Sequence, residues 1–286
     1  MAGQGLVTEI EGRQLTLTNL DKVLYPDGTT KGQVIDYYVR IAPVLLPHLS
    51  GRNITMKRYP NGVDGQSFYN KNIPSHAPDW VERVALHDNT YIVCRDLPTL
   101  VWMANLASLE LHVPLHRAAD DCWDPDRIVF DLDPGPGTGI AECCEVALLI
   151  AEVLRPLGMT LRAKTSGSKG MQLYAISPAA MAYKGEGGTT ELAHRLADGM
   201  ALAHPGLIVA KQAKELRPGK VLIDWSQNVQ AKTTVCAYSL RARPAPTVST
   251  PLAWSEVEAG AAGAPLRFAA GEVLDRVAST GDLFAL

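Results

Sequence analysis

The sequence lacks several patterns that would define its class at once. The sequence has no C-x-x-C pair, so its cysteines are expected to be small buried side chains and not part of a metal site or a disulfide framework. The five cysteines are Cys94, Cys122, Cys143, Cys144 and Cys236. No stretch approaches the roughly 18 apolar residues of a membrane span. The N-terminus has no basic start followed by an apolar run. We therefore expect a cytoplasmic protein of a reducing compartment.

An excess of positive charge is also missing. The 286 residues carry a formal net charge of -3, with 20% charged and 47% hydrophobic residues. This balance excludes a uniformly basic coat, so any binding to nucleic acid must come from local basic patches. The hydrophobic content is sufficient for a large core, in one large or two small domains.

Familiar metal and nucleotide motifs are absent as well. His112 and His116 lie in an extended segment and lack the glutamate of a zinc protease. The segment 165–170 combines hydroxyl residues, glycines and Lys169, which would let a backbone approach phosphates, but it does not have Walker A spacing and alone resembles a hairpin turn. No Lys-x-Asp-Gly motif is present, so this chain alone is not expected to seal nicks.

The sequence does contain an apolar strand that ends in two aspartates. Asp131 and Asp133 follow residues 128–130 and precede the Pro/Gly turn at 134–137. Because side chains alternate along a strand, both carboxylates share one face, where they could hold a pair of Mg²⁺ or Mn²⁺ ions. An EF-hand is disfavoured because Pro136 stands where that loop needs glycine. A sugar transferase, which also uses Asp-x-Asp, remains an alternative.

A third acidic strand supports the metal interpretation. Asp224 ends the apolar run 221–223, so three aspartates on two strands become a plausible site for metal ions. A basic connection precedes it, formed by Lys211, Lys214, Arg217 and Lys220. A charge run is usually a solvated surface. Next to a carboxylate metal site, it favours a polyphosphate or a nucleic-acid backbone.

Strands and helices alternate along the chain, which predicts a layered α/β core. Strands are expected at 13–18, 54–59, 91–93, 128–133, 171–176, 207–209, 221–225 and 233–240, and an extended segment at 109–116. Helices are expected after Thr30, with Pro43 and Pro47 limiting how far the first can run straight, and at 141–157 and 191–203. From residue 244 the sequence is first Pro-rich and then Ala/Gly-rich, with weak helical patterning and no catalytic or binding motif.

Three ordered motifs, 129–135, 165–170 and 222–228, resemble the polymerase domain of bacterial ligase D. That family belongs to the archaeo-eukaryotic primase superfamily and works in non-homologous end joining. The resemblance runs from about Leu15 to Arg243. It implies an α/β (α+β) primase-polymerase-like fold, with a central mixed or antiparallel sheet flanked by helices. We accordingly expect a catalytic domain at 1–243 and a connector and tail at 244–286.

The resemblance also implies roles for individual residues. The catalytic, metal-binding carboxylates are Asp131, Asp133 and Asp224. The residues that hold the incoming nucleotide are Lys57, Phe68, His112, Ser166, Lys169, Arg217, Gln227 and Arg241, with Phe68 similar to the aromatic that stacks on the base. The family often has paired aromatics there, and the second ring here is Tyr69. Asn19, Lys22 and Lys31 resemble a pocket for the 5′-phosphate of the downstream DNA strand, although both lysines would otherwise be interpreted as surface residues.

The implied function is a template-directed DNA/RNA polymerase that fills gaps and extends ends during repair of double-strand breaks. Two Mn²⁺ or Mg²⁺ ions and NTP or dNTP substrates are expected, with ribonucleotides used readily and no side chain required as a base. A Ku-type end-binding protein, a DNA ligase and 5′-phosphorylated DNA ends are the expected partners, in a nucleoid-associated location. The alternatives are a primase or primer-extending polymerase for replication or damage tolerance, a non-catalytic DNA-end-binding module, and, more remotely, a metal-dependent nuclease.

Overall fold

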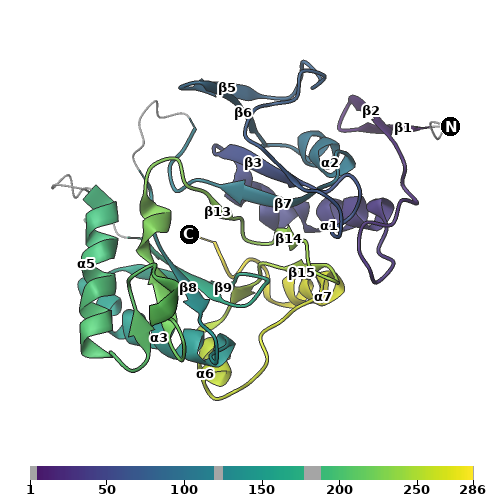
Figure 1. Cartoon of the computed structure of the whole chain (residues 1–286). Helices are drawn as coiled ribbons and strands as arrows, with labels where there is room; N and C mark the ends of the chain where they lie inside the picture. The colour runs from purple at the N-terminus through teal and green to yellow at the C-terminus, as the bar shows by residue number, and fades with distance from the viewer. Residues whose placement is uncertain (1–4, 119–124, 177–187, 286) are drawn as a thin grey trace. The chain divides into compact units, whose positions relative to one another are not determined.

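The computed structural model describes residues 5–118, 125–176 and 188–285. The chain forms two compact units, each assembled from separate segments (Figure 1). Unit 1 comprises Met1–Pro114, Val235–Ser249 and Phe268–Asp282, and unit 2 comprises Leu115–Thr234, Thr250–Arg267 and Leu283–Leu286. Both units therefore include residues beyond 243, and the expected division at 243/244 stays a prediction.

Unit 1 contains a hairpin and a larger sheet. The hairpin pairs β1 (Leu6–Ile10) with β2 (Arg13–Leu17). The sheet has the order β13-β7-β3-β6-β5, with β4 paired to β3. Its strands are β3 (Asn53–Arg58), β4 (Phe68–Asn70), β5 (Arg83–Leu86), β6 (Asn89–Val93), β7 (Ser108–Val113) and β13 (Thr234–Val235). A short ladder of β14 (Leu240–Arg241) and β15 (Thr247–Val248) completes the unit.

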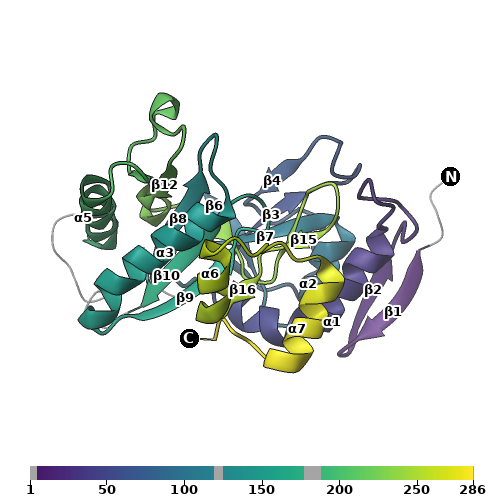
Figure 2. The same ribbon diagram turned by 90° about the horizontal axis from the view of Figure 1, so that it is seen from below.

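Helices of unit 1 pack against one another beside this sheet (Figures 1 and 2). They are α1 (Lys31–Leu49), α2 (Leu97–Asn105) and α7 (Ala270–Thr280), and α1 contacts both others. Thr30 caps α1, as its sequence predicts, in a capping box with Gln33. Pro43 and Pro47 both lie inside α1, which continues to its end at Leu49. The apolar face of α1 is fully buried, and this packing outweighs the backbone hydrogen bonds that the prolines remove.

Unit 2 is built on a mixed sheet of order β11-β12-β8-β10-β9-β16. Its strands are β8 (Ile128–Pro134), β9 (Thr160–Thr165), β10 (Met171–Ile176), β11 (Ile208–Val209), β12 (Val221–Asp224) and β16 (Pro251–Leu252). All pairs are antiparallel except β11 with β12. The helix α3 (Ile140–Leu154) packs on α6 (Trp254–Ala261) (Figure 2), and α5 (Gly188–Ala203) contacts β8 and β11. The expected mixed sheet with flanking helices is confirmed.

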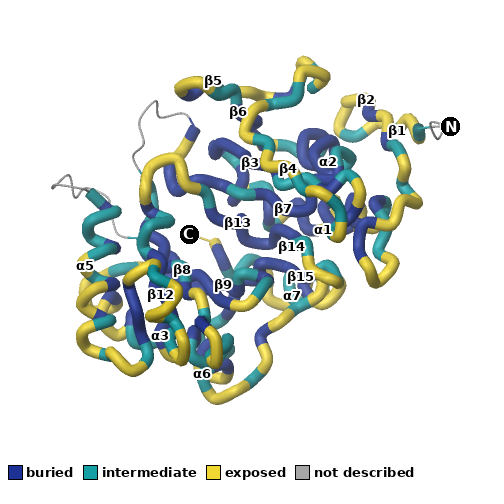
Figure 3. Tube along the Cα trace, in the orientation of Figure 1, coloured by how far each residue is buried: buried dark blue, intermediate teal, exposed yellow. Residues whose placement is uncertain are grey.

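The buried residues are mainly the apolar ones, which alternate along the strands and recur at helical spacing in the helices. The strands β3, β7, β8 and β9 are largely dark in Figure 3, which marks the two cores. Cys94, Cys143, Cys144 and Cys236 are buried free thiols, as predicted, whereas Cys122 lies outside the described residues. Short 3-10 helices fill connections at η1 (Arg155–Leu157), η2 (Lys214–Leu216) and η3 (Trp225–Asn228).

One local expectation is wrong. The strand expected at 233–240 is interrupted, because Tyr238 adopts a positive φ of 65° and its amide turns to the Ser249 carbonyl. Only β13 and β14 remain of it. The C-terminal tail has more secondary structure than its weak helical patterning indicates. It forms β16, α6 and α7, and α7 begins with a backbone cap from Glu272.

Candidate functional site

Three aspartates lie on two adjacent strands of unit 2. Asp131 and Asp133 alternate along β8 with Leu132 between them, so they project to one face. In the antiparallel register of β12 with β8, Asp224 lies opposite Asp131 and Leu222 lies opposite Asp133. The sheet therefore brings together the carboxylates that the sequence separates by about ninety positions.

The electrostatics of this group are those of crowded anions. Burial and the neighbouring Asp133 carboxylate raise the pKa of Asp131 to about 7, and Asp224 contributes in the same direction. A hydrogen bond from Gln172 and the charge of Lys164 act in the opposite sense and lower that pKa. A divalent cation would relieve the repulsion, so the donor set has the chemistry of a site for a hard metal ion.

Asp224 is held by hydrogen bonds from its own surroundings. Its Oδ1 accepts from Gln212 Nε2 at 2.8 Å and from Ser226 Oγ at 2.6 Å, while its Oδ2 accepts from Gln227 Nε2 at 2.9 Å. Within the described ranges, no group of three or more His, Cys, Asp or Glu side chains is arranged to hold a metal ion. The carboxylates thus lie on two neighbouring strands without already forming a closed coordination cage.

Two glycines let neighbouring loops approach the aspartate strand closely. A Cβ at Gly170 would lie 2.0 Å from the Leu132 carbonyl oxygen, and one at Gly135 would lie 2.0 Å from the Arg217 carbonyl oxygen. Only glycine leaves room for these contacts. Gly170 places the 166–170 loop against β8, and Gly135 does the same for the basic connection, which Gly135 N also joins through a 2.9 Å hydrogen bond to Lys220 O.

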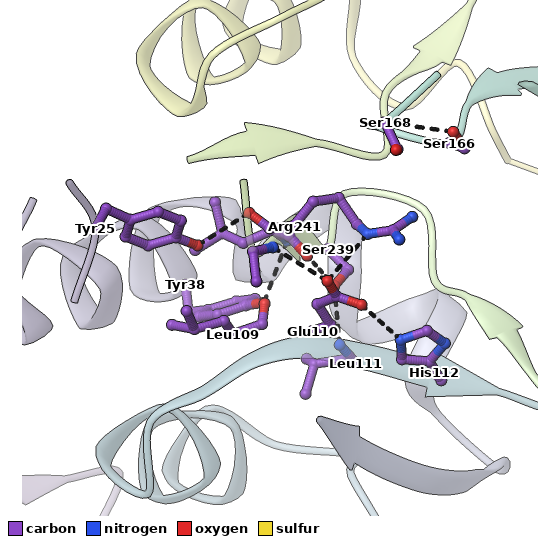
Figure 4. Close-up of polar contacts among 12 residues, drawn as sticks. Tyr25, Tyr38, Leu109, Glu110, Leu111, His112, Ser166, Ser168, Ser239 and Arg241 are labelled. Atoms are coloured by element: carbon purple, nitrogen blue, oxygen red, sulfur yellow. Dashed lines mark hydrogen bonds and ion pairs between the residues drawn. The ribbon is translucent and has the colours of Figure 1, made fainter. Parts of the chain in front are cut away.

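Thr165 and residues 167–170 line a cavity of about 650 Å³ within unit 2. Ser166 accepts a hydrogen bond from the Ser168 amide at 3.2 Å (Figure 4), and Lys169 is exposed at the cavity wall. The opposite side of the cavity is lined by the 134–140 turn and by residues 265–267. The loop does join two strands as a hairpin, β9 to β10, so the simplest interpretation of its sequence is confirmed.

The basic connection is organised around Gln212 and Arg217. Arg217 Nη2 donates to the Gln212 carbonyl at 2.6 Å and to its Oε1 at 2.9 Å, and the same Gln212 side chain donates to Asp224. Arg217 Nε is buried with no hydrogen-bond partner among the residues that the structure describes. Such an orphaned donor on a cationic side chain suits an anionic ligand.

A buried lysine lies on the same sheet face as Asp131, two strands away. Lys164 on β9 is fully buried, and its Nζ donates to Gln172 Oε1 at 2.5 Å. Gln172 pairs directly with Asp131 in the β10–β8 register, so Lys164 reaches Asp131 through Gln172. Sequence reasoning missed Lys164, Gln172 and Gln212. The alternation of side chains along β9 and β10 indicates which face Lys164 and Gln172 occupy. It identifies their neighbours only once the strand register is known.

In unit 1, two of the four predicted nucleotide residues, Lys57 and His112, lie on one sheet face. Lys57 lies opposite Glu110 and Tyr69, and its ammonium group is 5.0 Å from the Tyr69 ring centre. His112 lies on the same face, with its ring 6.0 Å from that of Tyr69. Phe68 is the next residue along β4 and therefore projects to the opposite face, where it is exposed.

Glu110 joins two of these residues at the centre of Figure 4. Its carboxylate is 3.0 Å from His112 Nε2 and 3.3 Å from Arg241 Nε. Burial alone would raise the pKa of Glu110, but the His112 hydrogen bond and the Arg241 charge outweigh it and hold that pKa at about 2. Glu110 was not singled out from the sequence, where it is one acidic residue in an apolar strand.

The residues predicted to bind a 5′-phosphate lie around the start of α1. Lys31 is buried, and its Nζ donates to the Thr18 carbonyl at 2.5 Å. Burial first, and then the charges of Lys22 and Arg58, lower the pKa of Lys31 to about 8. Lys22 is exposed and donates to Asn61, and Asn19 is exposed with a positive φ of 52°. Unit 1 therefore brings Lys22 and Lys31 near each other, and the repulsion between their charges contributes to the lowered pKa of Lys31.

Comparison with known proteins places this architecture in a family. The family described as LigD, primase-polymerase domain, matches residues 30–284. The multifunctional non-homologous end joining protein LigD of Mycolicibacterium smegmatis is 46% identical over 95% of this chain, and the bifunctional LigD of Bacillus subtilis is 34% identical over 94%. The chain spans 36% and 43% of the lengths of these two relatives.

A solved structure agrees with the sequence comparisons. The polymerase domain of Mycobacterium tuberculosis ligase D, determined in complex with DNA, matches with a TM-score of 0.84 and 41% identity, covering 94% of this chain and 96% of that one. The fold and its carboxylate-bearing sheet thus define a primase-polymerase type of nucleotidyltransferase domain. The chain belongs to the LigD primase-polymerase domain family.

Proposed function

We propose that this protein is a template-directed polymerase that adds nucleotides at DNA ends and gaps during non-homologous end joining. The observation that carries the proposal is the register of unit 2, in which Asp224 lies opposite Asp131 while Gly170 and Gly135 bring a lysine-bearing loop and a basic connection against the same strand. Carboxylates next to a cationic, glycine-lined surface suit phosphoryl transfer better than simple DNA binding.

Asp131, Asp133 and Asp224 are proposed to hold two divalent cations, Mn²⁺ or Mg²⁺. When bound, such ions would lower the pKa of a primer 3′-hydroxyl and neutralise the charge of the leaving pyrophosphate. The protein itself fixes the orientation of the carboxylates that would bind the ions. Gln212, Ser226 and Gln227 orient the Asp224 carboxylate, and Gln172 orients that of Asp131.

The nucleotide is proposed to be bound by Ser166, Lys169, Arg217 and Gln227 of unit 2 and by Lys57, Phe68, His112 and Arg241 of unit 1. The support from unit 2 is the exposed Lys169 on its cavity wall and the orphaned Nε of Arg217. The support from unit 1 is the shared face of Lys57 and His112. These cations place fixed positive charge where negative charge develops during transfer. Phe68 is proposed to stack on the base, for which its exposed ring is suited.

Asn19, Lys22 and Lys31 are proposed to bind the 5′-phosphate of the downstream strand. A terminal phosphate carries more negative charge than an internal one, so two ammonium groups distinguish an end from continuous duplex. The proposed partners are 5′-phosphorylated DNA with gaps or overhangs, a Ku-type end-binding protein and a DNA ligase, in the nucleoid region of the cytoplasm. No helix among the described residues is long and apolar enough to cross a membrane.

A primer-extension assay on a gapped duplex tests the proposal. The purified protein receives each nucleotide in turn with Mn²⁺ or Mg²⁺, and templated addition is expected only for the nucleotide complementary to the gap. Binding of the duplex with no addition under any of these conditions would instead identify a DNA-end-binding module.

A further inference from the structure

We propose that Glu110 is a positioning residue that fixes His112 and Arg241 for the phosphates of the incoming nucleotide. This inference rests on the proposed function and adds a residue to it. Glu110 does not itself touch the nucleotide, because a buried carboxylate would repel phosphate. It acts through the two side chains that it orients.

The geometry places one carboxylate at the junction of two elements of unit 1. On β7, Glu110 Oε2 is 3.0 Å from His112 Nε2. On β14, its Oε1 is 3.3 Å from Arg241 Nε and accepts a 3.1 Å hydrogen bond from the Ala242 amide. The Glu110 side chain is only 3% exposed, so these contacts are formed away from water. The His112 and Ala242 contacts are hydrogen bonds to an ionised carboxylate, which are strong and hold their donors in one direction. The Arg241 Nε contact is an ion pair rather than a hydrogen bond.

Buried hydroxyl groups hold the backbone on both sides of this carboxylate (Figure 4). Tyr38 donates to the Leu109 carbonyl at 2.7 Å, and the Leu111 amide donates to Ser239 Oγ at 2.9 Å. Tyr25 donates to the Arg241 carbonyl at 3.2 Å. The residues that flank Glu110 and the residue that it pairs with are therefore fixed before any ligand binds, which is the condition for a preorganised site.

The contact also decides which nitrogen of His112 carries the proton. An ionised carboxylate only accepts hydrogen bonds, so Nε2 must donate and Nδ1 becomes the nitrogen that meets a ligand. Burial, with the charges of Arg241 on β14 and Lys57 on β3, lowers the pKa of His112, while Glu110 raises it. The net result is a lowered pKa of His112. Glu110 opposes this lowering, and an anionic phosphate at Nδ1 would oppose it further by stabilising the imidazolium that donates from Nδ1. Tyr69 of β4 packs edge-on against the same ring.

Removing the charge of Glu110 distinguishes a positioning residue from a member of a purely structural ion pair. Loss of such a pair lowers stability and leaves the nucleotide KM unchanged. Loss of a positioning residue raises the nucleotide KM and changes the tautomer of His112, whether or not stability falls. Glu110→Gln makes the distinction, because the amide keeps the size of the side chain but can donate as well as accept.

The experiment compares wild type with Glu110→Gln and with Glu82→Gln. Glu82 forms an exposed ion pair with Arg95 in the same unit and serves as the matched control. Primer extension gives KM for the nucleotide and kcat, and ¹⁵N NMR of the histidine rings gives the tautomer and pKa of His112. For Glu110→Gln we expect KM to rise about tenfold, or about 1.4 kcal/mol, with a smaller change in kcat and loss of the Nε2–H tautomer. Glu82→Gln should match wild type in all of these.

An unchanged KM and an unchanged His112 tautomer in a folded Glu110→Gln protein would overturn the inference and leave the proposed function intact. If wild type extends no primer with any nucleotide, the proposed function itself fails. Should Glu110→Gln not fold, Glu110→Asp keeps the charge on a shorter side chain. It is expected to raise KM less than tenfold while the Nε2–H tautomer persists, and a wild-type KM would again contradict the inference.

Discussion

Asp224 lies directly opposite Asp131 in the antiparallel pairing of β12 with β8. The two residues come from distant parts of the sequence. Burial and the Asp133 carboxylate are the main causes that raise the pKa of Asp131 to about 7, and the Asp224 carboxylate adds to them. Neighbouring buried carboxylates repel each other and destabilise the folded state unless a cation or hydrogen-bond donors offset their charge. The structure provides donors, and the proposed metal ions would provide the cations.

Metal removal is expected to abolish nucleotide addition without unfolding the protein. Asp224 accepts hydrogen bonds from Gln212, Ser226 and Gln227, and Asp131 accepts one from Gln172, so we expect the fold to be independent of an ion. EDTA should stop primer extension, and restored Mn²⁺ should support it better than Mg²⁺, as the family resemblance implies. Circular dichroism should stay unchanged throughout. Full extension in EDTA would contradict the two-metal proposal.

Gly170→Ala is expected to destabilise unit 2 and to impair catalysis. The new methyl group would lie 2.0 Å from the Leu132 carbonyl oxygen, so the 166–170 loop must move away from β8. Overpacking of this kind costs about 1–3 kcal/mol, measurable by urea unfolding. Gly199→Ala is the matched control, because nothing lies within 4 Å of its added Cβ and it sits inside α5. Alanine there should be neutral or stabilising, and equal effects at both glycines would contradict the steric argument.

Recognition of a 5′-phosphate is expected to weaken as pH rises through 8. The lowered pKa of Lys31, about 8, means that its ammonium form is present below this pH and lost above it. The phosphate is already fully ionised above its second pKa of about 6, so only the lysine changes between pH 7 and 9. Fluorescence anisotropy on gapped duplexes with and without the phosphate gives the affinity ratio at each pH.

The control for this effect is the double variant Lys22→Ala/Lys31→Ala. It should bind both duplexes equally at every pH, and added salt should reduce the preference of the wild type. A phosphate preference that persists in the double variant would place the 5′-phosphate elsewhere on the protein.

The sequence predicts the elements of this protein better than their contacts. The strand before Asp131, the helix capped by Thr30 and the mixed sheet follow from alternation, capping chemistry and apolar periodicity, and all are present. The break at Tyr238 was not predictable, because a run of strand-forming residues does not reveal a positive φ imposed by a distant carbonyl. Local propensity is a weak guide wherever tertiary hydrogen bonds decide the backbone.

The supporting residues of the site were hidden for a related reason. Lys164 and Glu110 are charged residues in apolar strands, which sequence reasoning interprets as solvent-facing. Their burial depends on partners across the sheet, Gln172 for Lys164 and Arg241 for Glu110. Strand register and packing create these pairs, and a single sequence contains neither. The roles implied for the motif residues came from family resemblance and remain predictions.

The most direct test of the account is templated extension by Asp224→Asn, with Asp131→Asn beside it. Both substitutions keep the side-chain size but remove the negative charge of a proposed metal ligand. Extension should therefore fall below one per cent of wild type, about 2.7 kcal/mol of barrier, while binding of gapped DNA is kept. Asp198→Asn, on the exposed surface of α5, is the control and should extend like wild type. Extension above one per cent by Asp224→Asn, with the control active, would contradict the assignment of the carboxylates on β8 and β12 as the catalytic centre.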